Sequence, residues 1–185
     1  MSTFLTMTGG GAKAALALEA VIPAPTSREE GSEMATDNAV CALGKVLEMQ
    51  AGCVGGDAVA SRLTGVWLSY LPLRADVAEA RVVHAALVRA CERGDERVFG
   101  GTPFAGLPRV LAVLADVSGT ELLDDEYSGR AVTVIARMQA VLPAGALEAA
   151  LAPLSPAAHA KLLGNGAAGV GGGANHAGGS AGADS

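Results

Sequence analysis

Apolar residues recur every three or four positions through the middle of the chain, between Thr36 and Gly94. This spacing places them on one stripe of a helix with 3.6 residues per turn. Three such stripes follow one another, with short joints and no strand signal. Their members are Val40, Leu43 and Leu47; then Val59, Leu63, Val66, Trp67 and Tyr70; then Ala80, Val83, Leu87, Ala90 and Cys91. Each stripe must be buried against a neighbour, so the sequence predicts a stack of helices.

Capping and breaking residues set the expected limits of these three helices. The first is predicted to run to about Gln50, and Pro72 ends the second. The third has Glu79 as a capping-box partner and Gly94 just after its last turn. The predicted N-caps are Thr36 or Asp37, then Asp57, then Asp76.

The helical pattern continues in the C-terminal half. A loop at 95–106 precedes a fourth helix, and the acidic link at 124–126 favours the start of a fifth. A short turn of helix covers 147–151, and Ser155-Pro156 begins a last helix that ends near Leu163. The expected core positions of the fourth and fifth helices are Leu107, Val110, Leu111, Leu114, Ala131, Ile135, Met138 and Leu142.

The predicted helices form antiparallel pairs: 36–50 with 57–71, 77–93 with 104–117, and 126–142 with the short terminal helices. Successive pairs begin about 40 to 50 residues apart, near the period of HEAT and armadillo solenoids. We therefore predict an all-α fold, a HEAT-repeat (ARM-type) α-solenoid segment of about three helical pairs. A plain helical bundle gives the same list of helices and remains open.

Composition divides the chain into three parts. Residues 1–12 are predicted to be a disordered N-terminus, and 13–163 to be the helical segment, with a short helix at 14–22. Residues 164–185 are nearly all Gly, Ala, Asn and Ser, which predicts a disordered tail. The N-terminus is a poor match to a secretory signal or an organelle transit peptide. No apolar run approaches the ~20 residues of a membrane span.

Charge and composition narrow the expected partners. The formal net charge is −6, and the cations form no basic patch, which argues against nucleic acid or an anionic membrane as the main partner. Basic protein segments fit better. Half the residues are apolar but only 3% are aromatic, so small side chains must build the core. Cys41, Cys53 and Cys91 form no CxxC pair and are expected to be free, buried thiols.

Candidate chemistry in the sequence is sparse. Residues 164–169 match G-x-G-x-x-G but lack the strand before and the helix after that a dinucleotide site needs. His84 and Cys91 share a helix face, but two turns, about 10 Å, separate them, which is too far for a nucleophilic pair. His159 and His176 have no partner at the spacing of metal ligands.

The remaining polar and aromatic candidates have structural interpretations. The carboxylates at 124–126 fit a solvated helix start better than a metal site or an acid–base pair. Trp67 and Tyr70 are expected in the core, with a binding-pocket role for Trp67 as the second interpretation. Four arginines are expected on a solvated helix face with i,i+4 support, namely Arg81, Arg89, Arg93 and Arg97. We therefore expect no catalytic, cofactor-binding or metal-binding residue, and the sequence does not specify which residues bind protein.

Four stretches carry a family resemblance. They are DNAVCALGKVLEM at 37–49, WLSYLPLRAD at 67–76, ERVFG at 96–100 before LPRVLAVLAD, and ALEAALAPLSPAAHAKLL at 146–163. In this order and spacing, they resemble the C-terminal HEAT repeats of the importin-beta (karyopherin-beta) superfamily, from about Ala15 to Leu163. The most specific pieces are Asn38-Ala39 with Ala42 and Lys45, and Trp67 with Leu71-Pro72-Leu73.

The resemblance implies a non-enzymatic nuclear transport receptor. It implies a right-handed superhelix that wraps protein cargo carrying basic signals, release of cargo by the GTP form of Ran, and passage through nuclear pores between cytoplasm and nucleus. Family members are several times longer, and the repeats that grip Ran lie mostly near their N-terminus, so no Ran-contact residue can be transferred. Two alternatives stay open: a helical scaffold or adaptor without transport, and a small enzyme using Cys91 or the carboxylates at 124–126.

Overall fold

All regular secondary structure in the described part of the chain is helical. A computed structural model describes residues 4–22, 27, 29–50, 52, 54–101, 104–143, 145–159 and 161–162, without the side chains of 4–9 and 21. Within these ranges there is no strand, which confirms the all-α prediction. The helices are α1 (Phe4–Val21), α2 (Glu33–Gln50), α3 (Asp57–Ser69), α4 (Val77–Glu92), α5 (Glu96–Phe99), α6 (Leu107–Val117), α7 (Asp125–Val141) and α8 (Ala146–Leu151).

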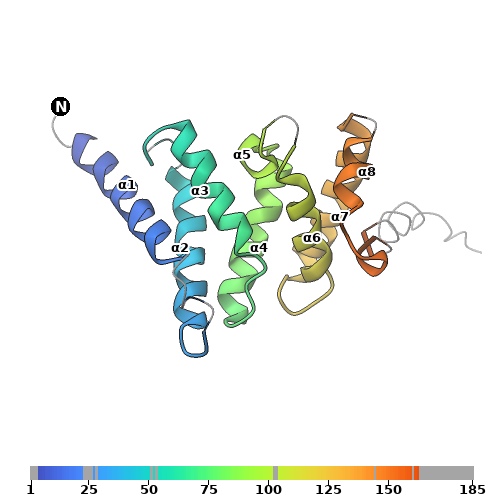
Figure 1. Ribbon diagram of the computed structural model, residues 1–185, viewed down its shortest axis with the longest axis horizontal. Coiled ribbons are helices and arrows are strands. Elements are labelled where there is room, and N and C mark those ends of the chain that lie inside the picture. The colour runs from blue at the N-terminus through green and yellow to red at the C-terminus, as the bar shows by residue number, and fades with distance from the viewer. Residues whose placement is uncertain are drawn as a thin grey trace, which may run out of the picture.

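The helices form an open, two-layered row (Figure 1). One layer consists of α2, α4 and α7, each packed against the next, and the other contains α1, α3, α6 and α8. The short helix α5 lies between α3 and α6 and contacts both. Contacts connect neighbours along the row, and α1 and α8 lie at opposite ends (Figure 1).

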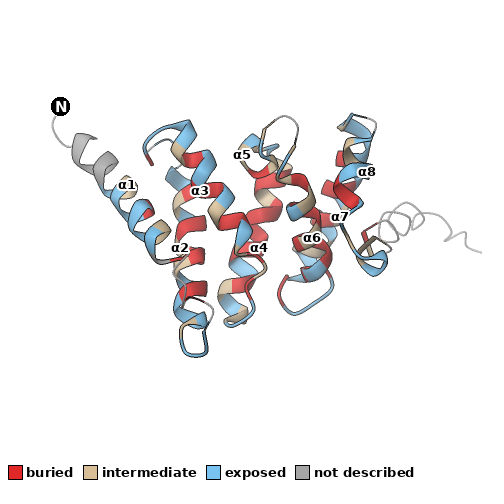
Figure 2. Cartoon of the chain, viewed as in Figure 1, coloured by how far each residue is buried: buried red, intermediate tan, exposed pale blue. Residues whose placement is uncertain are grey.

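The core runs between the two layers, and α4 is its most enclosed element (Figure 2). Buried positions occupy nearly every face of α4, because both α2 and α7 flank it within its layer. The predicted stripe of α4 is buried throughout: Ala80, Val83, Leu87, Ala90 and Cys91. The predicted stripes of α2 and α6 are fully buried as well, and those of α3 and α7 are buried or half-buried.

The start of α2 differs from the sequence prediction. Thr36 and Asp37 do not cap this helix, which begins at Glu33; both lie inside it and are buried. The hydroxyl of Thr36 donates to the backbone carbonyl of Ser27 at 2.6 Å. The carboxylate of Asp37 accepts the backbone N–H groups of Arg74 (3.2 Å) and Ala75 (2.9 Å) in the α3–α4 loop. Both side chains bond to backbone groups outside α2, so the prediction that one of them caps α2 is wrong.

His84, near the middle of α4, ties two loops together. It is fully buried, its Nε2 accepts the N–H of Leu73 at 3.2 Å, and its Nδ1–H donates to the carbonyl of Leu122 at 2.8 Å. Burial is the main cause that lowers its pKa, so the neutral ring with the proton on Nδ1 is the form that fits both bonds. Asp37 and His84 thus clamp the α3–α4 and α6–α7 loops. We call this side of the row the clamped edge.

The N-cap predicted at Asp76 is confirmed, and the one predicted at Asp57 is wrong. Asp76 caps α4 as predicted, because its side chain accepts the N–H groups of Ala78 (2.9 Å) and Glu79 (3.1 Å). Glu79 does not close a capping box; its carboxylate instead accepts hydrogen bonds from Cys41 and Lys45 of α2. Asp57 is the first residue of α3, not its cap, and Gly56 precedes it with φ 95°.

The chain ends also differ in part from expectation. Helix α1 begins at Phe4 and continues through the glycines at 9–11, whereas the sequence predicts disorder over 1–12. Glycine disfavours a helix interior by about 1 kcal/mol relative to alanine, which is why the pattern predicted no helix there. Residues 156–159 are helical, and the hydroxyl of Ser155 accepts the N–H of Ala158 at 3.2 Å, which confirms the predicted cap. The predicted disordered tail, 164–185, lies outside the described residues.

Candidate protein-binding surface

The connection between α4 and α6 holds the short helix α5 in a fixed position. Asp95 caps α5 by accepting the N–H of Arg97 at 3.1 Å, and Gly100 ends it with φ 75°. The N–H of Gly106 donates to Phe99 O at 2.9 Å and closes the loop. A Cβ at Gly106 would lie 2.3 Å from Val98 O, so only glycine fits this close approach.

Phe104 in this loop has an unusual backbone conformation. Its φ is 66°, in the left-handed region that bulky residues rarely adopt. Its N–H donates to Gly101 O at 2.6 Å and its carbonyl accepts from Leu107 N at 3.0 Å. Such conformations raise the energy by about 1–3 kcal/mol and persist where the surroundings over-determine them. The loop therefore directs the Phe104 ring to one side of α5.

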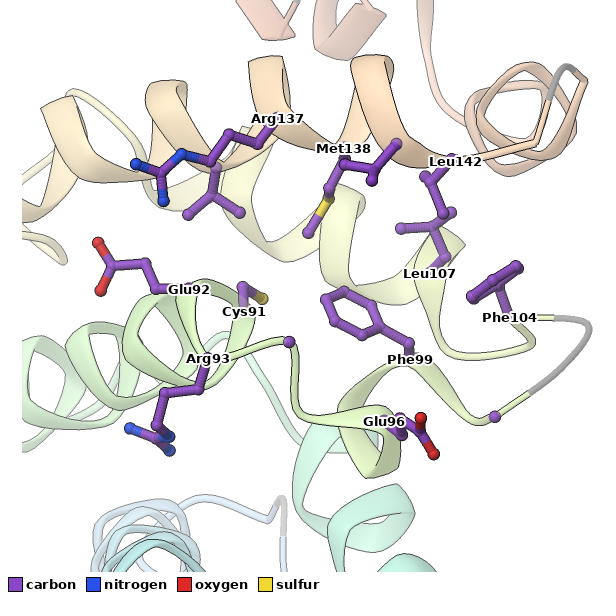
Figure 3. Close-up of a pocket in the computed structure, with 14 residues that line it drawn as sticks. Cys91, Glu92, Arg93, Glu96, Phe99, Phe104, Leu107, Arg137, Met138 and Leu142 are labelled. Atoms are coloured by element: carbon purple, nitrogen blue, oxygen red, sulfur yellow. The ribbon is translucent and has the colours of Figure 1, made fainter.

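That side of α5 carries an apolar cleft with a volume of about 560 Å³ (Figure 3). The end of α4 and the loop after it form one wall, α5 and the start of α6 form the floor, and the second half of α7 forms the other wall (Figure 3). Side chains from these elements converge on it: Phe99, Phe104, Leu107, Met138, Val141 and Leu142. Val141 is 79% exposed, so this apolar surface reaches solvent.

The charges around the cleft fall into two groups. Glu92 is held by Arg130, with N–O distances of 2.6 and 2.8 Å, and Arg93 lies 3.4 Å from Glu48. The hydrogen bonds from Arg130 are the main cause that lowers the pKa of Glu92, with Arg137 a smaller one. Among the described residues, the side chains of Arg137 and Glu96 make no hydrogen bond and no ion pair within 4 Å. Glu92 is already paired with Arg130, so Arg137 adds a second positive charge at its end of the cleft, and Glu96 adds a carboxylate without a direct partner.

The opposite side of α5 faces a larger groove of about 1020 Å³ that extends to α3, which we call the carboxylate-rich groove. Its lining includes the carboxylates Asp57, Asp95 and Glu96. Its two guanidiniums are engaged, because Arg97 binds Asp95 and Arg109 donates to the carbonyls of Leu68, Ser69 and Leu71 at the end of α3. The groove therefore keeps an excess of carboxylate. Glu96 and Gly101 line both the cleft and the groove.

The predicted arginine face has a different organisation from the expected one. Arg89 binds Glu48 of α2 through two hydrogen bonds of 2.7 and 2.9 Å, and donates to the Tyr127 hydroxyl of α7 at 3.0 Å. Arg130 lies 4.4 Å from the centre of the Tyr127 ring. These contacts join α2, α4 and α7 across the layer, whereas the sequence predicted support within one helix. Arg81 donates to Glu121 O at 2.8 Å in the α6–α7 loop.

The candidate chemical residues are not brought together. His84 uses both ring nitrogens on backbone groups, and burial raises the pKa of the Cys91 thiol to about 12. The two side chains therefore form no nucleophile–base pair. His159 Nε2 lies 2.8 Å from Leu151 O. Cys53, His176 and residues 164–169 lie outside the described part of the chain.

Acidic residues at 124–126 begin α7, as predicted. Asp124 is the N-cap residue and lies 3.5 Å from Arg81, while Glu126 lies 3.2 Å from Arg130 one turn later. No group of three or more His, Cys, Asp or Glu side chains in the described residues is arranged to hold a metal ion. None of the helices in these ranges has both the length and the apolar character that crossing a bilayer requires.

Trp67 belongs to the core, in agreement with the first interpretation. It is 4% exposed, and its indole lies against Gly44 of α2. A Cβ at Gly44 would lie 2.6 Å from Trp67 Nε1, so glycine permits the close crossing of α2 and α3. Within the part of the chain that the structure describes, the indole N–H has no hydrogen-bond partner. Trp67 is therefore a packing residue, not part of the exposed clefts.

No protein-family model matches this sequence. The clefts beside α5 were not predicted, because their walls come from segments about forty residues apart and α5 itself is only four residues long. The available signals were the two phenylalanines and the three glycines of the 95–106 segment, which the sequence alone indicated only as a loop.

Proposed function

We propose that this chain is a HEAT-repeat segment that binds other proteins without covalent chemistry, as the C-terminal part of a nuclear transport receptor. Within the importin-beta superfamily, the sequence resembles most the receptor called importin beta-three. By this resemblance, the cargo carries basic signals, and the full-length receptor binds Ran and nuclear pore proteins as it moves between cytoplasm and nucleus.

The open, two-layered row is the observation that supports this proposal best. Equivalent helices α2, α4 and α7 begin at Glu33, Val77 and Asp125, so successive units are offset by 44 and 48 residues. Each unit packs on its neighbours and not around a shared centre. This arrangement favours a HEAT-type solenoid over a closed bundle, and solenoids present long surfaces to partners.

The carboxylate-rich groove between α3 and α5 has the charge that suits a basic ligand. Its carboxylates outnumber its guanidiniums, and both guanidiniums already have partners in the protein. Asp57 and Glu96 are exposed, so a lysine or arginine of a partner can reach them. Electrostatic complementarity of this kind gives specificity and fast association, and salt weakens it.

The test uses a defined peptide. A fluorescein-labelled peptide rich in Lys and Arg is expected to bind the full chain more tightly at 50 mM than at 200 mM salt, measured by fluorescence anisotropy. The double variant Asp57→Lys/Glu96→Lys is expected to weaken binding at least tenfold, because it reverses two charges in the groove. Lys13→Glu on α1 serves as the distant control. Salt-independent binding, or equal binding by the groove variant, would count against the proposal.

The main alternative is a helical-repeat scaffold or adaptor without transport activity, which uses the same surfaces. Binding to a peptide of Phe-Gly repeats separates the two, because only a transport receptor must pass the nuclear pore. Specific binding of such a peptide, and loss of cargo peptide on addition of GTP-bound Ran, favour the receptor. Failure of both, with basic-peptide binding retained, favours the scaffold.

A further inference from the structure

We infer that the apolar cleft beside α5 takes a bulky apolar side chain of a partner peptide, with an acidic residue of that peptide against Arg137 and a basic one against Glu96. The inference rests on the proposed function, because it specifies which basic segments the chain binds. It also assigns a definite binding site to a part of the surface that the sequence left unspecified.

The size and lining of the cleft suit an apolar anchor. About 560 Å³ lies within the range of ligand pockets, and a single aromatic or large aliphatic side chain fills only part of it. Phe99, Phe104 and Met138 turn toward the cleft from three different elements (Figure 3). Val141 adds exposed apolar surface at its mouth. Aromatic and aliphatic anchors in such pockets carry much of the binding energy of protein interfaces.

The Arg137 guanidinium and the Glu96 carboxylate determine which charges the bound peptide must carry at each end. Arg137 lies on the α7 wall and Glu96 on α5, at opposite ends of the view in Figure 3. The other two charges at the mouth, Glu92 and Arg93, already pair with Arg130 and Glu48. A ligand that placed like charges beside Arg137 and Glu96 would be repelled, so complementarity requires an acidic group at one end and a basic group at the other.

The groove continues the path beyond Glu96. Glu96 and Gly101 border both depressions, so a peptide that leaves the cleft past Glu96 enters the carboxylate-rich groove. Apart from its chain neighbours, no described residue has an atom within 4 Å of where a Cβ would stand on Gly101. A peptide backbone can therefore approach closely as it crosses α5. The expected ligand has one acidic residue, a bulky apolar residue, and then several basic residues, in one direction or the other along its chain.

The experiment uses three capped, fluorescein-labelled peptides with the full chain. The first has one aspartate, a central phenylalanine and three lysines, joined by serine spacers; the second has alanine in place of phenylalanine; the third has lysine in place of the aspartate. Loss of the phenylalanine is expected to weaken binding about tenfold. Fluorescence anisotropy measures each affinity at constant salt.

Two exposed positions test the cleft from the protein side. Val141→Asp is expected to weaken binding of the first peptide about tenfold and to leave the alanine peptide unaffected. Arg137→Glu is expected to weaken the first peptide about fivefold, because about 1 kcal/mol of charge pairing becomes repulsion. The same variant is expected to bind the third peptide more tightly than the first, which a merely structural role for Arg137 does not explain. Lys13→Glu, with the same change of charge at the other end of the row, is the matched control.

The outcomes separate this inference from the proposed function. If the wild-type chain binds the alanine peptide as tightly as the phenylalanine peptide, the cleft is not an anchor site, but the proposal of basic-segment binding stands. If Val141→Asp and Arg137→Glu both bind within twofold of wild type, the inference is likewise overturned. If loss of the phenylalanine weakens binding but the affinity of the phenylalanine peptide is the same at 50 mM and 200 mM salt, the anchor site stands and the proposed function fails.

Discussion

The two edges of the helical row use polar groups in opposite ways. At the clamped edge, Asp37 and His84 are fully buried, and both bond to the backbone of the loops between helices. At the opposite edge, around α5, the side chains of Arg137 and Glu96 are exposed and make no hydrogen bond or direct ion pair among the described residues, and apolar side chains line an open cleft. One edge is closed by its own polar groups, and the other keeps both polar and apolar surface uncovered.

This difference separates stability from recognition. Buried hydrogen bonds fix the positions of the α3–α4 and α6–α7 loops and therefore the way each helical pair is set against the next. Because the hydrogen bonds of the clamped edge already fix the two loops, the α5 edge can expose the side chains of Arg137 and Glu96 at little cost in stability. We therefore expect substitutions at the clamped edge to change unfolding, and substitutions at the α5 edge to change binding.

Replacing His84 is expected to give the largest effect. His84→Ala removes two buried hydrogen bonds and leaves a cavity in α4, so the free energy of unfolding should fall by about 3 kcal/mol. Urea unfolding followed by circular dichroism measures it. A loss below about 1 kcal/mol would show that the His84 bonds do not hold the clamped edge together.

Asp37 should have the second-largest effect. Asp37→Ala leaves the N–H groups of Arg74 and Ala75 without their acceptor, at a loss of about 2 kcal/mol. Asp37→Asn keeps an oxygen acceptor at the same place and should lose about 1 kcal/mol. The same urea titration compares them. Equal losses for the two variants would contradict the view that acceptance of these N–H groups is what matters.

Acid should weaken the clamped edge through His84. Burial lowers the pKa of His84 below its ordinary 6.5, so the folded chain keeps the ring neutral while the unfolded chain gains a proton. Stability is then complete above about pH 6.5 and falls as pH drops toward the folded pKa, by up to about 1.4 kcal/mol per pH unit.

To test this, the urea unfolding midpoint is measured at pH 7.5 and at pH 5.5 for wild type and for His84→Gln, and the decrease is compared between the two proteins. The half-buried carboxylates of Glu48 and Glu92 titrate lower, because hydrogen bonds from Arg89 and Arg130 lower their pKa values. Wild type should therefore lose more stability than the variant over this range. Parallel losses in the two proteins would show that other groups carry the pH dependence.

The α5 edge should give the smallest change in stability. Val141→Asp and Arg137→Glu alter exposed side chains and should shift the free energy of unfolding by less than about 0.5 kcal/mol. The same two proteins are expected to lose peptide binding. A stability loss comparable to that of Asp37→Ala would mean that the α5 edge is structural after all, and that the two edges do not differ in role.

Much of the helical framework was predictable because its signal is local. The stripe Ala80, Val83, Leu87 needs only a period of 3.6 residues to be recognised, and it is buried as predicted. The cap at Asp76 and the start of α7 at Asp125 follow from neighbouring residues in the same way. The cap expected at Thr36 or Asp37 failed because a carboxylate that accepts backbone N–H groups looks the same in sequence whether those groups are adjacent or far along the chain.

By itself, the sequence determined α2, α3, α4, α6 and α7 to within a few residues and which face of each is buried, since both depend on spacings within a few turns. It missed the start of α1 and the short helix α5. Only the tertiary structure decided that Asp37 binds a loop 37 residues away, that His84 joins two loops, and that α5 lies between an apolar cleft and an acidic groove. These features depend on which distant segments meet. That is set by the packing of whole helices, and no local pattern of residues records it.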